Sequence, residues 1–515
     1  MEVISLGHAG LMVKGEGITL LMDPWFSPEG NFQASWFQYP DNSHLLSNDE
    51  LYKPTAIAIS HEHLDHCDPW FLSRVDSSVP VIIPKYPSPV LKEKILLGGN
   101  RPIIEVPEWE VYKLSETFSL FFVSEPPMNH DSAIILKVGD KTMLNMNDAR
   151  LFPMQLKDIR QKVGGVVDYF GFQGAGASWF PMVYNFDEEK MQKLRQLKRV
   201  SKFVYCAKIM KIVQPVVGMA FAGPPAFLDP ELFIHNREMT DGIFPDQQQV
   251  LDYLAKKGFE NTILMLPGDK WDANIQEQTK DDHWKDFSFS NREYYLKEYQ
   301  KTRLQHIANV YERNPVPEKS LWDDFKDYFE KLLKMNQYFN DNINMKVGFE
   351  ITGNGGGNWH VDFRKESQGV GQGIEDCGYN YKFESRWLAP VLREEVPWED
   401  FFLTLRFTCK RNPDMYNDHL LGLLKFANVE ALQQVEKFET QPKSEEMIKI
   451  HSEGKTYMIS RYCPHAGNDM LETGEVVPGG KFRCLAHHYD FDLGTGECIT
   501  GNCDHLKVVQ VTDED

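Results

Sequence analysis

Two short stretches of this sequence contain the residue types that bind metals. The first is Ser60-His61-Glu62-His63-Leu64-Asp65-His66, in which imidazoles and carboxylates stand at nearly every position. The second is a pair of motifs near the C-terminus, Cys463-Pro464-His465 and Cys484-Leu485-Ala486-His487. Imidazole, carboxylate and thiolate groups are the ligands that hold transition metals in proteins. Both stretches therefore predict metal centres, and their different donor atoms predict centres of different kinds.

The C-terminal motifs predict a Rieske [2Fe-2S] cluster. Such a cluster needs two thiolates on one iron and two imidazoles on the other. Cys463 with His465, and Cys484 with His487, supply one thiolate and one imidazole from each of two short loops. The alternative is a Cys2His2 zinc site, because zinc accepts the same atoms. A zinc finger expects both cysteines in one element and both histidines in the other, so the mixed loops favour the iron–sulfur cluster.

The residues around the two motifs agree with this interpretation. The run from Tyr489 to Cys498 resembles the segment after the second ligand loop in Rieske ferredoxins and oxygenase components. High-potential respiratory Rieske proteins carry an extra cysteine in each loop, whereas Asn468 and Ala486 stand near those positions here. This resembles the low-potential type that delivers electrons. We expect Cys498 and Cys503, which lie outside the motif, to be small core residues.

The N-terminal run resembles the His-x-His-x-Asp-His motif of the metallo-β-lactamase superfamily, and it directly follows a predicted strand, Ala56–Ile59. The resemblance implies an αββα sandwich with a dinuclear metal site. It also implies that His61 and His63 bind one metal, while Asp65 and His66 bind the other. Glu62 is either a surface residue or a group behind the ligands.

Four more residues fit this superfamily by their order along the chain. His130 falls where a third imidazole for the first metal is expected, and Asp148 falls where a bridging carboxylate is expected. Gly7-His8-Ala9-Gly10 and Asp23-Pro24-Trp25 resemble the opening strands of the superfamily, so His8 and Asp23 are expected to orient metal ligands. Taken alone, His8 would equally fit a core histidine with satisfied hydrogen bonds.

The last metal ligand departs from the superfamily pattern. The run Val216 to Gly223 resembles the late strand that is usually followed by a final histidine, but no histidine stands there. Asp229 is the first candidate for this ligand and His235 is the second. A carboxylate at this place would favour a harder metal such as iron over zinc.

Charge and hydropathy exclude several classes of protein. The chain has 515 residues with 55 Lys and Arg against 75 Asp and Glu, a net charge of −20, which argues against a nucleic-acid partner because phosphate contacts need a basic surface. No apolar run approaches the roughly 18 residues of a membrane span. The N-terminus lacks the pattern of a signal peptide. Eight cysteines are too few for a disulfide scaffold, so we expect a cytoplasmic protein.

Hydrophobic patterning predicts three domains. We expect a metallo-β-lactamase-like α/β domain at 1–270, a mixed α+β helical extension at 271–435 and a small all-β Rieske domain at 436–515. Short apolar runs bounded by turn residues predict strands in the first third of the chain, at 3–6, 18–22, 56–59, 81–83, 120–123, 132–138 and 142–144. Helical spacing of apolar residues predicts helices at 188–198, 247–257, 291–311 and 322–335.

The two metal motifs together resemble the CMP-N-acetylneuraminate hydroxylase family, whose members convert an N-acetyl group into an N-glycolyl group. Gly174–Met182, Phe221-Ala222-Gly223 and Arg411–Tyr416 also look like segments of that family. The order differs, because the Rieske domain comes first in that family and last here. The resemblance therefore implies an oxygenase chemistry, with less bearing on the substrate.

This combination of centres predicts a Rieske-dependent monooxygenase. Activation of O2 needs electrons delivered to a metal that can hold O2, and a Rieske cluster passes them one at a time. We expect an external reductase, ferredoxin or cytochrome as the electron donor, a small-molecule substrate such as an N-acyl sugar nucleotide, and non-haem iron at the dinuclear site.

Other functions are compatible with the same motifs. Zinc at the N-terminal site would make a hydrolase, in which a zinc-bound hydroxide attacks an ester, lactone or phosphodiester. A second alternative is an electron-transfer protein without catalytic activity. The intact set of candidate ligands from His61 to Asp148 argues against it. An oxygenase acting on an amine or amide is a third.

Overall fold

The computed structural model describes residues 1–125, 131–176, 178–442, 444–486 and 488–511. Contacts along the chain divide the described residues into two compact units. The first unit contains the described residues up to 312 except for 179–191, and the second contains 179–191 and the described residues from 313 onward.

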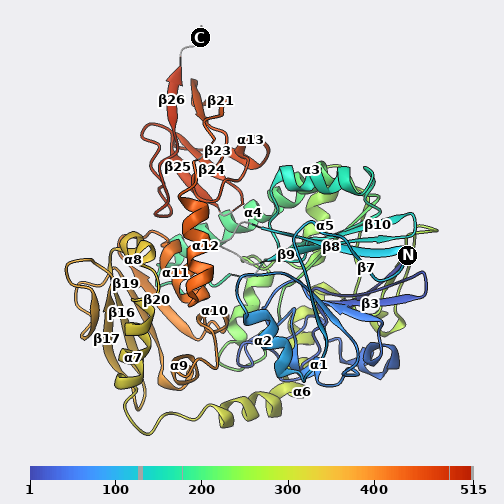
Figure 1. Ribbon diagram of the computed structural model, residues 1–515, viewed down its shortest axis with the longest axis horizontal. Coiled ribbons are helices and arrows are strands. Elements are labelled where there is room, and N and C mark those ends of the chain that lie inside the picture. Colours follow the sequence, from blue (N-terminus) through green and yellow to red (C-terminus); the bar gives the residue numbers. More distant parts are fainter. Residues whose placement is uncertain (126–130, 177, 443, 487, 512–515) are drawn as a thin grey trace. The chain divides into compact units, whose positions relative to one another are not determined.

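Two β-sheets form the centre of the first unit (Figure 1). The first sheet has the order β15-β14-β1-β2-β3-β4-β5-β6, with β1 (Glu2–Gly7), β2 (Gly10–Gly15), β3 (Ile18–Met22), β4 (Ala56–Ala58), β5 (Val81–Pro84), β6 (Ile103–Val106), β14 (Lys270–Asp272) and β15 (Glu277–Thr279). The second sheet has the order β13-β12-β11-β10-β9-β8-β7, with β7 (Tyr112–Lys113), β8 (Phe118–Ser124), β9 (Ser132–Val138), β10 (Lys141–Asn145), β11 (Tyr169–Gln173), β12 (Val217–Phe221) and β13 (Thr262–Ile263).

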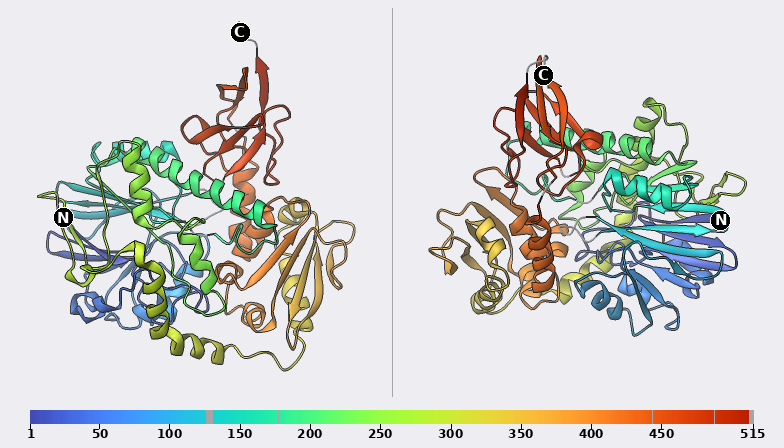
Figure 2. Two further views of the ribbon diagram at one scale, coloured as in Figure 1. Left: turned by 180° about the vertical axis from the view of Figure 1, so that it is seen from behind. Right: turned by 45° about the horizontal axis from the view of Figure 1, so that its top comes forward.

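The two sheets pack face to face because alternate residues of both are apolar. Leu11 and Leu20 of the first sheet share one buried cluster with Phe122, Ile134 and Met219 of the second. In the views of Figure 2 the blue strands and the cyan to green strands form two separate layers. The inner faces of the sheets therefore supply the largest hydrophobic core of this unit.

Helices cover both outer faces of the sandwich. Those of this unit are α1 (Pro69–Leu72), α2 (Val90–Leu97), α3 (Pro153–Lys162), α5 (Gln247–Lys256), all but the first turn of α4 (Glu188–Val213) and all but the last residue of α6 (Arg292–Arg313), with short 3-10 helices at Ser43–Ser47, Asp49–Tyr52, Phe233–Met239, Asp282–Trp284 and Phe289–Asn291. Phe71 of α1 and Ile95 of α2 pack on the first sheet, while Ile159 of α3 and Val250 of α5 pack on the second. The resulting αββα order is the one expected from the sequence.

Parallel strands bring distant loops to one edge of the sandwich. β3, β4, β5 and β6 pair in parallel in the first sheet, and β10, β11, β12 and β13 do so in the second. Asp23 follows β3, the Ser60–His66 run follows β4 and Asp148 follows β10. Loops at the carboxyl ends of parallel strands are the usual place for a binding site in such sheets.

The second unit begins with a five-stranded sheet of order β18-β17-β16-β19-β20 and the helices around it. The strands are β16 (Lys346–Thr352), β17 (Gly357–Asp362), β18 (Gly369–Gln372), β19 (Tyr379–Glu384) and β20 (Phe407–Arg411), and the helices are α7 (Trp322–Leu332), α8 (Gln337–Ile343), α9 (Ser385–Leu392), α10 (Trp398–Leu403), α11 (Asp418–Phe426) and α12 (Val429–Glu439). Aromatic rings fill its core: the rings of Phe325 and Phe329 on α7 lie 5.3 and 5.2 Å from that of Phe349 on β16.

The C-terminal part of the second unit contains two small antiparallel sheets. One is β21-β22-β26, formed by β21 (Met447–Ser452), β22 (Lys455–Ser460) and β26 (Val508–Val511), and the other is β23-β24-β25, formed by β23 (Gly474–Val477), β24 (Lys481–Cys484) and β25 (Tyr489–Asp492), with the single turn α13 (Met470–Thr473) between them. Cys498 belongs to the buried apolar cluster of this part, as expected for a small core residue, whereas Cys503 is only partly buried against that cluster.

Most predicted elements are confirmed within a few residues at their ends. The helix predicted at 188–198 is too short, because α4 continues to Val213. One apolar face of the helix continues over the second sheet through Cys206, Ile209, Met210 and Val213. The predicted helix ends too early because it leaves out these apolar residues, which repeat at helical spacing.

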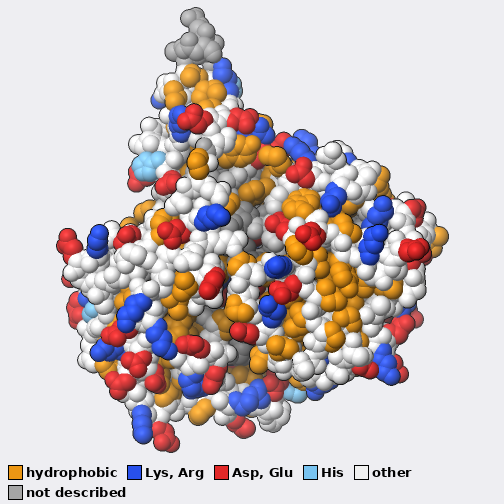
Figure 3. All heavy atoms as spheres, viewed as in Figure 1, with side chains coloured by type: hydrophobic (Ala, Val, Ile, Leu, Met, Phe, Trp, Pro, Cys, Tyr) orange, Lys and Arg blue, Asp and Glu red, His pale blue; other side chains and the backbone are white. Residues whose placement is uncertain are grey.

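The surface carries charged side chains of both signs. Lys and Arg side chains are interspersed with Asp and Glu side chains on the face drawn in Figure 3. Among the residues that the structure describes, no helix has the length and apolar character needed to cross a membrane.

Candidate metal centres

Asp23 fixes the loop that carries the N-terminal histidines. Its Oδ1 accepts a hydrogen bond from the Ser60 backbone N–H at 2.8 Å, and its Oδ2 accepts one from the Ser60 hydroxyl at 2.6 Å. The same Oδ2 lies 3.0 Å from His66 Nδ1, while the Ser60 hydroxyl lies 2.9 Å from His61 Nδ1. Asp23 thereby engages one ring nitrogen of His66 directly and one of His61 through Ser60. The predicted orienting role of Asp23 fits this geometry.

The other ring nitrogens of this loop converge with carboxylates in three overlapping groups. Within each group the possible ligand atoms lie within 4.8 Å of one another. The groups are His8 with Asp65 and His66, His61 with His66 and Asp148, and His61 with His63 and Asp131. Because His61 and His66 each belong to two groups, the arrangement offers neighbouring positions for two metals. The Nε2 atom of His66 lies 3.4 Å from Asp148 Oδ1, and His61 Nε2 lies 2.8 Å from His63 Nδ1.

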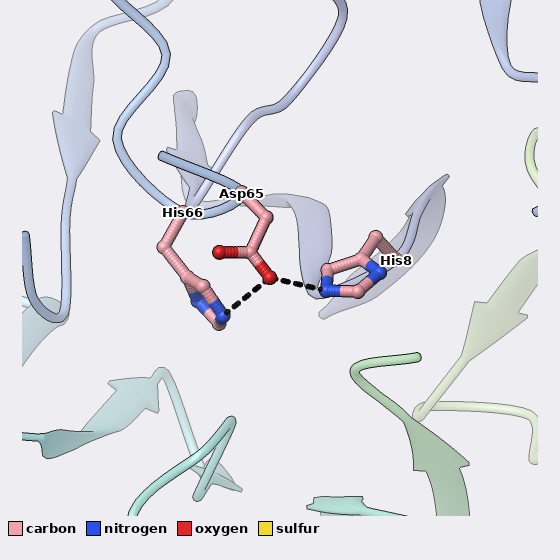
Figure 4. A group of neighbouring side chains, drawn as sticks. All are labelled: His8, Asp65 and His66. Atoms are coloured by element: carbon pink, nitrogen blue, oxygen red, sulfur yellow. Dashed lines mark hydrogen bonds and ion pairs between the residues drawn. The ribbon is translucent and has the colours of Figure 1, made fainter. Parts of the chain in front are cut away.

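His8 belongs to one of the metal-binding groups, and its contact with Asp65 also fits the orienting role expected for it. Its Nε2 is 2.8 Å from Asp65 Oδ2, and His66 Nε2 approaches the same oxygen at 3.8 Å (Figure 4). All three side chains are buried. Burial disfavours the charged form of Asp65, yet the charge of His66 and the hydrogen bond with His8 hold the pKa of Asp65 below its usual range. The sequence motif alone contained no sign of this contact, because 57 residues separate His8 from Asp65.

Neither candidate for the last ligand joins a metal-binding group among the described residues. Asp229 Oδ1 accepts a hydrogen bond from the backbone N–H of Glu231 at 2.8 Å. The His235 ring lies 5.7 Å from the Phe227 ring, and burial lowers the pKa of His235 to about 4. Ala222 and Gly223 occupy the place after β12 where the superfamily pattern expects the final histidine.

His130, predicted to bind the first metal, lies outside the described residues. Asp131, its neighbour, was not among the predicted ligands, and its Oδ1 lies 3.8 Å from His61 Nε2. Its position next to His130 in Asn129-His130-Asp131 was the only sequence signal for it. Glu62 joins none of the three groups of described residues, and its backbone carbonyl accepts a hydrogen bond from Lys94 at 2.8 Å.

A narrow pocket opens beside these groups. His8, Asp65 and Asp148 line it together with two aromatic rings, Trp36 and Phe244. The rest of its wall comes from the loops after β11 and β12, namely Ala175, Gly176, Ala222, Gly223 and Pro225. The small residues of these loops add little bulk next to the carboxylates, where the free space of about 10 Å³ matches one water molecule.

The donor set fits a transition metal. Buried imidazole nitrogens and carboxylate oxygens suit iron, zinc or manganese rather than calcium or magnesium, which prefer oxygen alone. Asp65 is 3% exposed, and a buried carboxylate is costly unless it is hydrogen-bonded or paired with a positive charge. A metal held by these residues would supply that charge.

The C-terminal motifs form a second candidate centre. Cys463 and Cys484 are buried and close together: burial raises the pKa of Cys463 well above its usual value, and the Cys484 thiol raises it further. The backbone N–H groups of His465 and Ala466 donate hydrogen bonds to the Cys463 sulfur, and Asn468 Nδ2 donates to Cys484 Sγ at 3.4 Å. Such donors stabilise thiolates bound to iron. His487 lies outside the described residues.

Comparison with known families matches three segments of the chain. Residues 424–510 match the Rieske [2Fe-2S] domain, and residues 2–131 match the β-lactamase superfamily domain. Residues 321–441 match the Rv3818-like, SCP2-like domain.

Two related proteins align with nearly the whole chain. A Rieske 2Fe-2S iron–sulfur protein of Mycolicibacterium smegmatis is 30% identical over 529 residues, which cover 98% of this chain and 99% of the relative. This chain belongs to the same Rieske iron–sulfur protein family. The Rieske 2Fe-2S iron–sulfur protein Rv3818 of Mycobacterium tuberculosis is 27% identical with this Rieske protein over 98% of this chain and 99% of its own.

Among solved structures, the Rieske protein described here resembles CmlA, a diiron beta-hydroxylase from Streptomyces venezuelae. The likeness has a TM-score of 0.37 and 17% identity, and it covers 54% of each chain. The metallo-β-lactamase fold of the N-terminal unit and the Rieske domain at the C-terminus agree with the expectations from the sequence.

Proposed function

We propose that this Rieske protein is a monooxygenase that uses a non-haem, dinuclear iron site in its metallo-β-lactamase domain. One observation carries the proposal: a cluster of His and Asp side chains at the strand ends of this domain occurs in the same chain as a Rieske domain. A Rieske cluster transfers electrons and has no use in hydrolysis, so its presence favours a redox reaction.

Two sets of residues would hold the two metal centres. Cys463, His465, Cys484 and His487 would hold the [2Fe-2S] cluster. His61, His63, Asp65, His66, His130 and Asp148 would hold the two metals, together with His8 and Asp131, which the structure adds. Bound iron would supply the site at which O2 is reduced, and incorporation of one oxygen atom consumes two electrons and two protons, which convert the other atom to water.

The chain's own residues bind the substrate and shield the reaction. Trp36 and Phe244 line the pocket, and the small residues Ala175 and Gly176 would allow the reacting group of a substrate to approach Asp65 and Asp148 closely. The likeness of Gly174–Met182 to the CMP-N-acetylneuraminate hydroxylase family supports an N-acyl sugar nucleotide or a related small molecule as the substrate. On the basis of the sequence, we propose Asp229, or else His235, as a further metal ligand.

An external electron donor completes the proposal. A reductase, ferredoxin or cytochrome would reduce the cluster, one electron at a time. The sparse cysteines support a cytoplasmic location, where such donors and reduced thiols are found.

The deciding experiment is the metal content of protein purified without air, combined with low-temperature EPR of the reduced sample. We expect about four iron atoms per chain and a Rieske signal, with two irons in the cluster and two at the N-terminal site. Consumption of O2 with a reductase and candidate N-acyl substrates then tests turnover.

The same measurement discriminates the competing hydrolase. A content of about two irons with about two zincs, and hydrolysis that proceeds without reductant, would contradict the oxygenase. The His and carboxylate donors of the N-terminal site accept zinc as readily as iron, which makes this comparison necessary.

A further inference from the structure

The Rieske ligand His465 meets a carboxylate that belongs to the preceding domain. Its Nε2 lies 3.4 Å from Asp418 Oδ2. Asp418 is the first residue of α11, within the segment that matches the SCP2-like domain. Both side chains are nearly buried, with 6% and 12% of their surface exposed, so water screens this contact weakly.

Several contacts hold Asp418 at this place. The Tyr489 hydroxyl donates a hydrogen bond to Asp418 Oδ2, and the Tyr489 ring lies 4.7 Å from the His465 ring. Two residues before Asp418, the Tyr416 backbone N–H donates to the Thr500 carbonyl at 2.9 Å. Asn417 caps α11 by accepting a hydrogen bond from the Leu420 N–H at 2.8 Å. Tyr489 therefore holds the carboxylate directly, and the Tyr416–Thr500 hydrogen bond holds the backbone before it against the Rieske domain.

A second carboxylate nearby is already engaged by other groups. Glu439 of α12 lies 3.0 Å from His419 Nε2 and accepts a hydrogen bond from the Tyr338 hydroxyl at 2.9 Å. The hydrogen bond and the charge of His419 hold the pKa of Glu439 below its usual value, despite its burial. The charge of His465 also lowers the pKa of Glu439, so both carboxylates act on this ring, and Asp418 is the one whose oxygen lies in ion-pair contact with it at 3.4 Å.

We propose that Asp418 is a positioning residue that orients His465 and lowers the reduction potential of the Rieske cluster, so that the SCP2-like domain adjusts the cluster of the neighbouring domain. A histidine that binds a metal donates its other ring N–H to an acceptor, and a carboxylate there makes the ligand a stronger electron donor. One-electron reduction also adds a negative charge to the cluster, which the negative charge of Asp418 opposes.

The inference rests on the Rieske cluster of the proposed function but not on oxygen chemistry. Its test is an anaerobic redox titration of the full-length protein with mediators, followed by EPR of the reduced cluster. In Asp418→Asn we expect the ratio of reduced to oxidised cluster at a fixed ambient potential to rise about tenfold, which is a positive shift of about 59 mV for a one-electron couple. Because no turnover is measured, a failed oxygenase assay leaves this result intact.

Two further variants serve as controls. Asp418→Glu keeps the charge and should shift the potential less than Asp418→Asn. Glu436→Gln removes a carboxylate of the same domain that accepts a hydrogen bond from Asn336 at 2.9 Å, and it should leave the potential unchanged.

Each outcome of this experiment either supports or overturns the proposed role of Asp418. An unchanged potential in Asp418→Asn, or an equal shift in Glu436→Gln, would overturn the proposal. If Asp418→Asn fails to assemble the cluster while Asp418→Glu retains it, the need for a charge at His465 is supported. Loss of the cluster in both variants would assign Asp418 a structural role only and would overturn the proposal.

Discussion

At the residue scale, His8 is the position where the structure adds most to the sequence. Its ring approaches Asp65 at 2.8 Å, on the side of the site where the superfamily pattern lacks its final histidine. A Cβ built at Gly223, after β12, would lie 4.0 Å from His8 Cε1, so the His8 ring lies near the end of that strand. His8 is therefore placed to supply the imidazole that the loop after β12 does not.

We predict that His8→Gln weakens metal binding at the N-terminal site by at least about 10- to 100-fold, the range found when a group that orients a metal ligand is lost. The measurement is the metal content of the purified protein and its affinity in a chelator competition. His235→Gln is the matched control, because His235 joins no metal-binding group among the described residues. Equal metal loss in the control would show instead that His235 is the last ligand.

At the element scale, the loops after β11 and β12 shape the pocket through close contact of their backbones. Gly223 has a φ of +108°, and a Cβ there would lie 3.0 Å from the Ala175 Cβ. His8, Asp23, Asn147 and Ala222 also have positive φ values, from 38° to 54°. Such conformations are costly for residues other than glycine and concentrate at functional sites.

We predict that Gly223→Ala destabilises the protein more than Gly258→Ala does. Both glycines have positive φ, but a Cβ at Gly258 would meet nothing within 4 Å. The control should therefore cost only the backbone strain, about 1–2 kcal/mol, while Gly223→Ala adds the clash with Ala175. Chemical denaturation measures both, and equal losses would refute the close packing of the two loops.

At the scale of the whole molecule, the two metal centres lie in different compact units. The ligand groups from His8 to Asp148 belong to the first unit, while Cys463, His465 and Cys484 belong to the second. Each unit has its own hydrophobic clusters. Loss of one centre should therefore leave the other folded and occupied.

We predict that Cys463→Ser loses about two irons and the Rieske EPR signal, because a hydroxyl replaces one thiolate ligand. The metals of the N-terminal site should stay bound, as elemental analysis would show, and turnover supported by a reductase should stop. Full turnover in this variant would refute electron delivery through the cluster. Loss of all the metal would show that the two units depend on each other.

Most of the fold and the candidate ligands of both centres could be predicted from local sequence. The αββα layers follow from alternating apolar strands and helical spacing, and the Rieske domain follows from two short motifs in which candidate ligands stand two or three residues apart. The His61 to His66 run is local in the same way, because one loop after one strand carries four candidate ligands. Hydrogen bonding and metal chemistry restrict such short segments without reference to the rest of the chain.

Contacts between distant segments required the tertiary structure. His8 meets Asp65 across 57 residues, and Asp131 reaches the imidazole of His61 although the motif of that histidine ends at His66. Asp229 and His235 looked suitable by position, but the path of the chain after β12 brings neither into a group of described ligands. Asp418 stands next to no motif, and only the docking of α11 against the Rieske domain places its charge on His465.

The sequence by itself therefore determined the type of fold, the Rieske motif and the run of imidazoles and carboxylates after one strand, because those depend on residue type and short spacing. The tertiary structure alone decided which distant side chains lie beside these candidate ligands and which charges act on them. The physical reason is that electrostatic and packing interactions depend on distance in space, and strand order, sheet packing and domain contacts set that distance between residues far apart in the chain.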